Sequence, residues 1–284
     1  MMRQRTALLT LLAMVAFAAN SLLCRLALRH TGIDAASFTL IRIVSGALTL
    51  AIIVRLRDGQ PSAVGNWGSA AALFIYAAAF SLAYVNLTAA TGALLLFGAV
   101  QVTMIGHGLV RGERLRGWQQ PLGFCLALAG LVALLLPGLQ APPLLGSVLM
   151  IAAGVAWGLY SLRGKRGGDP LQVTAGNFLR AVVPAAALSL ALLPWLALDR
   201  AGVLYAVASG ALASGVGYAV WYTALPGLAV TSAATVQLSV PVIAAVVGIV
   251  LLDEAVTLRL LLASVAILGG IAWVVLAPRQ VDAT

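Results

Sequence analysis

The chain has 284 residues, of which 62% are hydrophobic and only 9% are charged. Soluble domains carry about 25% charged residues and disordered chains are poor in apolar ones, so this composition excludes both classes and indicates an integral membrane protein. The net charge of +9 arises without any basic run interleaved with aromatic residues. It therefore favours arginine-rich cytoplasmic loops over binding to nucleic acid.

The chain contains ten stretches of about the 20 apolar residues that a membrane-spanning helix needs. Arg3 and Arg5 before the first stretch resemble the start of a secretory signal, but the apolar run continues to Leu28, so we expect this helix to be retained. Turn residues such as Pro137-Gly138 separate several of the stretches. The expected spans cover residues 7–28, 35–54, 67–87, 91–110, 118–136, 144–162, 171–192, 201–222, 231–252 and 258–276.

The distribution of Lys and Arg predicts the orientation of these spans. If the N-terminus is cytoplasmic, 11 basic residues fall on the inner side and 4 on the outer side, so we expect both termini in the cytoplasm. The inner group comprises Arg3, Arg5, Arg55, Arg57, Arg111, Arg114, Arg116, Arg163, Lys165, Arg166 and Arg279, and the outer group comprises Arg25, Arg29, Arg200 and Arg259.

The second half of the chain repeats the first at an offset of 138 to 141 residues. Arg42 aligns with Arg180, and Tyr84 aligns with Tyr222. Because each half holds five spans, an odd number, the second half enters the membrane from the opposite side. We therefore expect an all-α integral membrane protein of ten transmembrane helices, built as two inverted five-helix repeats over residues 1–138 and 139–284. Such repeats bind substrate at their interface near the middle of the bilayer.

Several features of the repeat also mark a family. They are the Arg in the second span of each half, Gly112-Glu113 and Asp253-Glu254 after the fourth span of each half, and Gly or Pro in spans four and nine. In these features the whole chain resembles the drug/metabolite transporter superfamily, in particular its EamA type and the bacterial amino-acid exporters within it. The resemblance implies a ten-helix inner-membrane transporter that exports small metabolites by alternating access.

All eight acidic residues lie outside the spans or at their ends. Ionised side chains within a membrane usually mark proton or ion paths, and none of these carboxylates is placed to serve as one. Small multidrug exporters of the same superfamily carry a Glu in their first span, where this chain has Met14, Ala16 and Ala18. Proton-coupled drug export is therefore disfavoured, and facilitated diffusion is the simplest mechanism.

Aromatic and neutral polar residues inside the spans are the candidates for binding substrate. Tyr76 and Phe80 lie four residues apart, on one helical stripe, and at an offset of 138 they align with Ser214 and Tyr218. Rings with hydroxyl groups suit a cavity for an amphipathic metabolite; packing between helices is the alternative. The further candidates are Asn20, Phe97, Gln101, Trp157 and Gln237.

Pro241 and Gly92 are the candidates for bending or gating a helix. Pro241 should delete a backbone hydrogen bond and kink span nine, and the freed carbonyl together with Gln237 could bind an ammonium group, while helix N-termini hold a carboxylate. Alternatively, Pro241 only shapes the helix and the glutamines bond between helices. Two alternatives also stay open for Arg42 and Arg180: bonds to carbonyls of neighbouring spans, with Arg42 snorkelling outward, or contact with a substrate carboxylate.

Taken together, the residues and the resemblance predict an exporter of amino acids or similar zwitterionic metabolites, a monomer or homodimer in the lipid bilayer of the bacterial inner membrane. Cys24 and Cys125 stand alone, so neither a disulfide nor a metal site is indicated, and we expect no cofactor. The alternatives are a same-fold exporter of a purine, a nucleotide-sugar or a drug, and a membrane-embedded enzyme. An enzyme would need a nucleophile and base, or a metal site, at depth, and no such residues converge in the spans.

Overall fold

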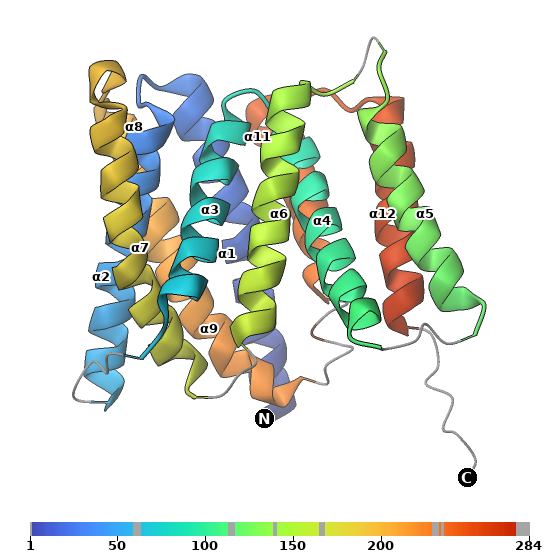
Figure 1. The fold of residues 1–284 in the computed structure, drawn as a ribbon, viewed down its shortest axis with the longest axis horizontal. Coiled ribbons are helices and arrows are strands. Elements are labelled where there is room, and N and C mark those ends of the chain that lie inside the picture. Colours follow the sequence, from blue (N-terminus) through green and yellow to red (C-terminus); the bar gives the residue numbers. More distant parts are fainter. Residues whose placement is uncertain are drawn as a thin grey trace.

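The computed structural model describes residues 2–58, 64–112, 117–138, 141–164, 168–228, 233 and 236–276. These residues form a bundle of helices that stand side by side, with no strand among them (Figure 1). The described residues do not include Glu113, Arg114, Arg116, Lys165, Arg166 and Arg279, on which the predicted orientation and family partly depend.

Ten helical segments follow one another along the described chain. Those of the first half are α1 (Met2–His30), α2 (Ala35–Asp58), α3 (Trp67–Tyr84), α4 (Ala89–Val110) and α5 (Gln119–Leu135). Those of the second half are α6 (Leu144–Gly164), α7 (Pro170–Ala191), a rod made of α8 (Arg200–Ala208), the π-helix η2 (Ser209–Val216) and α9 (Gly217–Ala224), then α11 (Ser239–Leu252) and α12 (Leu258–Leu276). Two short 3₁₀ turns, η1 (Leu193–Trp195) and η3 (Leu225–Gly227), follow α7 and α9.

Eight of these segments are long and apolar enough to cross a bilayer, and they correspond to eight of the ten expected spans. The remaining two, α5 and α11, are shorter apolar helices of 17 and 14 residues. In lipid a helix satisfies its own backbone hydrogen bonds, so such apolar stretches fold as helices.

Polar residues in the breaks start several helices. The side chain of Asn66 accepts a hydrogen bond from Ser69 N at 2.8 Å, and Asp199 accepts one from Gly202 N at 2.9 Å. Asp34 Oδ1 accepts from Ala36 N and Ser37 N, both at 2.9 Å. Each side chain satisfies backbone donors that have no partner within their helix. Asp34 and Asp199 thereby stabilise the starts of their helices.

The helices pair across the two halves of the chain. α2 packs against α7, α3 against α6, α5 against α12, and α4 against α6 and α11, while α1 contacts α8, η2, α9 and α11. α5 and α12 form a pair at one side of the bundle (Figure 1). Glycines permit this close contact, since a Cβ at Gly123 would lie 2.6 Å from the carbonyl oxygen of Gly270.

The π-helix η2 lies directly against α2. A Cβ at Gly210 would overlap Ser45 Oγ and the backbone carbonyl oxygen of Arg42, so only glycine allows this approach. Turns of π-helix inside α-helices occur frequently at functional sites. Here the π-helix brings its own residues and the middle of α2 together beside the cavity described below.

The structure places Pro241 and Gly92 near the starts of helical segments. α11 begins at Ser239 after a turn at Leu238, so Pro241 belongs to the first helical turn, where a proline removes no intrahelical hydrogen bond. Gly92 lies in the first turn of α4, and a Cβ there would fall 2.6 Å from Tyr84 Cζ. Gly92 therefore makes room for a tyrosine ring. In span nine the helix is interrupted at Leu238, between helical residues 236–237 and α11, three residues before Pro241.

Candidate substrate cavity

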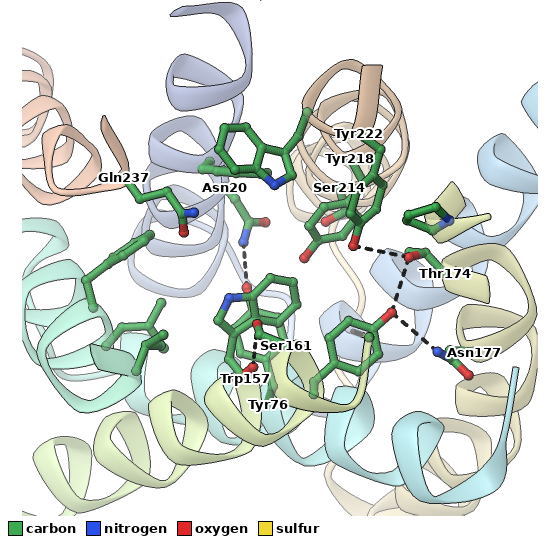
Figure 2. Close-up of a pocket in the computed structure, with 18 of the residues that line it drawn as sticks. Asn20, Tyr76, Trp157, Ser161, Thr174, Asn177, Ser214, Tyr218, Tyr222 and Gln237 are labelled. Carbon is green, nitrogen blue, oxygen red and sulfur yellow. Dashed lines mark hydrogen bonds between the residues drawn. The ribbon is translucent and has the colours of Figure 1, made fainter. Parts of the chain in front are cut away.

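A cavity of about 440 Å³ lies between helices of both halves, within the size range of small-molecule sites. Residues of α1, α3, α4, α6, α7, η2 and α9 line it, and most of their side chains are aromatic, hydroxyl-bearing or amide-bearing. Among the described residues, none of those lining it is Asp, Glu, Lys, Arg or His. The cavity therefore offers ring faces and neutral hydrogen-bonding groups to a ligand (Figure 2).

Eight of the nine residues proposed from the sequence to bind substrate line this cavity. Gln101 does not, although it is buried. The α4 residues that face the cavity are Leu96, Phe97, Val100 and Met104, and Gln101 lies beyond the edge of that stripe because each helical residue turns by about 100°. The eight that do line it are Asn20, Tyr76, Phe80, Phe97, Trp157, Ser214, Tyr218 and Gln237.

An aromatic wall centres on Trp157 of α6. Its ring stacks on that of Tyr218 with 5.5 Å between centroids and on that of Tyr160 with 5.3 Å, and it meets Tyr76 at 4.9 Å. These rings come from α6, α9 and α3, and Figure 2 shows Trp157 beside Tyr76. Offset and stacked rings at these separations stabilise one another, so the wall is held in place before any ligand arrives.

A first polar cluster joins α1, α3 and η2 beside the aromatic wall. Asn20 Nδ2 donates to the hydroxyl of Tyr76 at 3.2 Å, and Asn20 Oδ1 accepts from Ser209 Oγ at 2.7 Å. The Arg42 guanidinium donates to the same Tyr76 hydroxyl at 3.0 Å from behind the cavity wall. Arg42 is 2% exposed and does not snorkel outward, which settles one of the alternatives left open by the sequence.

A second polar cluster joins α6, α7 and α9. The Tyr160 hydroxyl donates to Thr174 Oγ1 at 3.3 Å, Thr174 Oγ1 donates to the Tyr222 hydroxyl at 3.4 Å, and Asn177 Nδ2 donates to Tyr160 at 3.5 Å (Figure 2). All four side chains are neutral. The first cluster differs from this one because the Arg42 guanidinium is bonded to it.

Three residues of the second cluster, Tyr160, Thr174 and Asn177, were not among the candidates from the sequence. A signal was present, because Trp157, Tyr160 and Gly164 follow helical spacing on one face of span six, and Thr174 and Asn177 do so on span seven. The same stripe argument that selected Tyr76 and Phe80 applies to both spans.

The cavity reaches one end of the bundle. Its lining includes Gly164 at the end of α6, Pro170 at the start of α7 and Leu225 after α9. These helix ends lie on the side of the molecule where the N-terminus lies (Figure 1). The mouth of the cavity is therefore on the N-terminal side.

A cluster of charged and backbone groups ties helices together at the opposite end. Glu254, which follows α11, accepts two hydrogen bonds from Ala89 N, at 2.9 and 2.8 Å, and its Oε1 lies 3.3 Å from Arg25 Nε of α1. Arg25 also donates to the carbonyls of Tyr84 and Val85 at the end of α3. We refer to Arg25, Glu254 and Ala89 N as the end clamp, since it joins α1, α4 and α11 away from the cavity mouth.

Comparison with known proteins agrees with this architecture. Residues 144–276, which run from α6 to the end of α12, match the model of the EamA-like transporter family. An uncharacterized protein of Pseudomonas aeruginosa is 63% identical over 277 residues, which are 97% of this chain and 96% of that protein. A solved crystal structure has the same fold with a TM-score of 0.68 at 21% identity, over 98% of this chain and 99% of that one. The second half of the chain is therefore similar to the EamA-like transporter family, and eight of the described helices are long and apolar enough to cross a membrane.

Proposed function

We propose that this protein exports amino acids or similar small zwitterionic metabolites across the bacterial inner membrane by alternating access. The observation that carries the proposal is the make-up of the cavity: an aromatic wall around Trp157 lies between two clusters of hydroxyl and amide groups. Ring faces suit an apolar side chain and an ammonium group. The polar clusters suit the remaining hydrogen-bonding groups of an amphipathic metabolite.

We propose further that transport is facilitated diffusion without proton coupling. Four of the six described acids are engaged at helix ends, where Asp34, Asp169 and Asp199 accept backbone hydrogen bonds and Glu254 belongs to the end clamp. Their protons are not placed to accompany a substrate through the cavity. The concentration gradient of the substrate then supplies the driving force.

The cavity would lie between two inverted repeats, residues 1–138 and 139–284. The helix pairings support this proposal. In such a repeat α1 corresponds to α6, α3 to the α8–η2–α9 rod and α4 to α11. The α3–α6 pair then has its counterpart in the pair of the rod with α1, and the α4–α6 pair has its counterpart in α11–α1. All four pairs occur. The pairs α2–α7, α4–α11 and α5–α12 exchange into themselves, as an axis in the membrane plane requires.

The proposed orientation has both termini in the cytoplasm, as the excess of Lys and Arg on that side favours. The mouth of the cavity, on the N-terminal side, then faces the cytoplasm, where an exporter takes up its substrate. The end clamp would close the cavity toward the outside in this arrangement.

Counterflow in proteoliposomes tests the proposal. Vesicles loaded with one unlabelled amino acid should accumulate the same labelled amino acid, at a rate that does not change when a pH gradient is imposed. Trp157→Ala should lower this flux at least tenfold because it removes the centre of the aromatic wall. The matched control is Trp273→Ala, since Trp273 of α12 meets Trp118 at 6.0 Å and does not line the cavity. Absence of counterflow across the amino-acid panel, or flux strictly dependent on the pH gradient, would contradict the proposal.

A further inference from the structure

Arg42 is a buried cation in the middle of α2. It is 2% exposed, and its guanidinium carbon lies 4.8 Å from the ring centroid of Phe80 and 5.2 Å from that of Tyr76. No ion pair involves Arg42 within the described residues, and its Nη1 has no hydrogen-bond partner there. Buried charges are usually paired with an opposite charge. The ring faces offset part of this cost, and one donor group is left without a partner.

Tyr76 connects the buried Arg42 to the cavity, since its hydroxyl bonds Arg42 and its side chain lines the cavity. A tyrosine hydroxyl has two acceptor positions and one proton to donate. The Arg42 guanidinium donates to the Tyr76 hydroxyl at 3.0 Å and Asn20 Nδ2 donates to it at 3.2 Å, so both acceptor positions are used. The orientation of the Asn20 amide follows from Ser209, whose hydroxyl donates to Asn20 Oδ1 at 2.7 Å. Tyr76 can therefore act toward a ligand only as a donor.

No acceptor among the described residues takes the Tyr76 proton, and Tyr76 lines the cavity (Figure 2). A donor whose lone pairs accept from a cation and an amide is polarised and donates more strongly. Its natural partner is an anionic oxygen, because hydrogen bonds to ionised acceptors are about twice as strong as neutral ones. Such an anion would also neutralise part of the charge of Arg42.

We propose that the Tyr76 hydroxyl is the carboxylate-binding donor of the cavity, with Arg42 as the positive charge that positions and polarises it. This inference rests on the proposed function and deepens it, since it requires every good substrate to carry a carboxylate. Arg42 is a positioning residue here, because it acts through Tyr76. The ammonium group of a zwitterion then lies toward the ring faces of Trp157 and Tyr218.

The arginine of the second half makes different contacts from Arg42 within the described residues. Arg180 and Ser214 align with Arg42 and Tyr76 at an offset of 138, but Arg180 donates to the carbonyls of Val64 and Gly176. The corresponding cavity groups belong to the neutral cluster around Tyr160. The carboxylate site thus uses the arginine of the first half, and it gives the substrate a fixed orientation in the cavity.

Binding to the purified full-length protein tests the inference with probes that share one carbon skeleton. Leucine and 4-methylpentanoate carry the carboxylate, whereas leucinamide and 3-methylbutylamine lack it, and phenylalanine with its amide provides a second skeleton. We expect each carboxylate to bind at least tenfold more tightly than its matched amide or amine. In Tyr76→Phe, which keeps the ring, this preference should fall to within about twofold. Tyr205→Phe in α8, outside the cavity lining, should retain it.

Equal binding of carboxylate and amide, no binding of any carboxylate, or an unchanged preference in Tyr76→Phe would overturn the carboxylate site. The ranking of probes by the unaltered protein needs no variant, so a Tyr76→Phe protein that fails to fold does not remove the test. Amino-acid counterflow without a carboxylate preference would refute this site and leave the proposed function standing. A carboxylate preference without amino-acid counterflow would refute the proposed function and leave the site standing.

Discussion

Weakening the end clamp should open the side of the protein opposite the cavity mouth. In alternating access, opening that side must separate α1, α4 and α11, which the clamp joins through Arg25, Glu254 and Ala89 N. Glu254→Gln removes the negative charge and keeps the size of the side chain. The amide oxygen that remains can accept from Ala89 N, but the ion pair with Arg25 is lost.

The size of the effect follows from the burial of the pair. The side chains of Arg25 and Glu254 are 11% and 8% exposed, so solvent screens them little. Removing one partner of a buried ion pair costs about 3–5 kcal/mol, and the acceptor that Gln retains reduces the loss to about 2 kcal/mol. Such a loss shifts the ratio of open to closed molecules roughly 30-fold.

A native cysteine reports the opening. Cys24 is fully buried and precedes Arg25 in α1, whereas Cys125 is exposed and is replaced by Ser for the assay. The rate at which a membrane-impermeant thiol reagent labels Cys24 should rise at least tenfold in Glu254→Gln. The control is Arg259→Gln, which neutralises a charged side chain outside the clamp, since Arg259 donates to the carbonyl of Leu136. An unchanged labelling rate in Glu254→Gln, or an equal rise in the control, would refute the role of the clamp.

Three further predictions concern stability, measured as the Tm of the purified protein. Gly210→Ala should destabilise by about 1–3 kcal/mol because its methyl group overlaps α2, whereas Gly106→Ala, with open space around its Cβ, should leave Tm unchanged. Burial raises the pKa of Asp34, but its hydrogen bonds outweigh burial and hold the pKa below its usual value. The stabilisation by Asp34 is therefore present above about pH 3.9 and is lost as the pH falls through the lowered pKa. The Tm of the unaltered protein should exceed that of Asp34→Asn above this acid range, and the difference should shrink within it and not elsewhere. Asn177→Ala should lower the stability of the protein by about 1–3 kcal/mol, because the buried Asn177 bonds both Tyr160 and the backbone before α3. An unchanged Tm would show that these bonds contribute nothing.

Local sequence predicted the helices and much of one cavity wall. Tyr76 and Phe80 share a stripe because an α-helix has a fixed period, and both line the cavity. The same period would have found Tyr160 and Thr174. Gln101 shows the limit of the argument, because a spacing of four residues does not reveal which face of a helix meets the cavity.

The sequence by itself determined that this is a membrane protein of apolar helices, because uninterrupted apolar stretches of about 20 residues match the length of a spanning helix, which satisfies its own backbone in lipid. Only the tertiary structure decided what Arg42 contacts, where Pro241 falls in its helix and how Asn20 meets Ser209. These contacts depend on which helix faces come together. In a uniformly apolar helix, hydrophobicity does not distinguish one face from another, so packing between distant segments makes that choice.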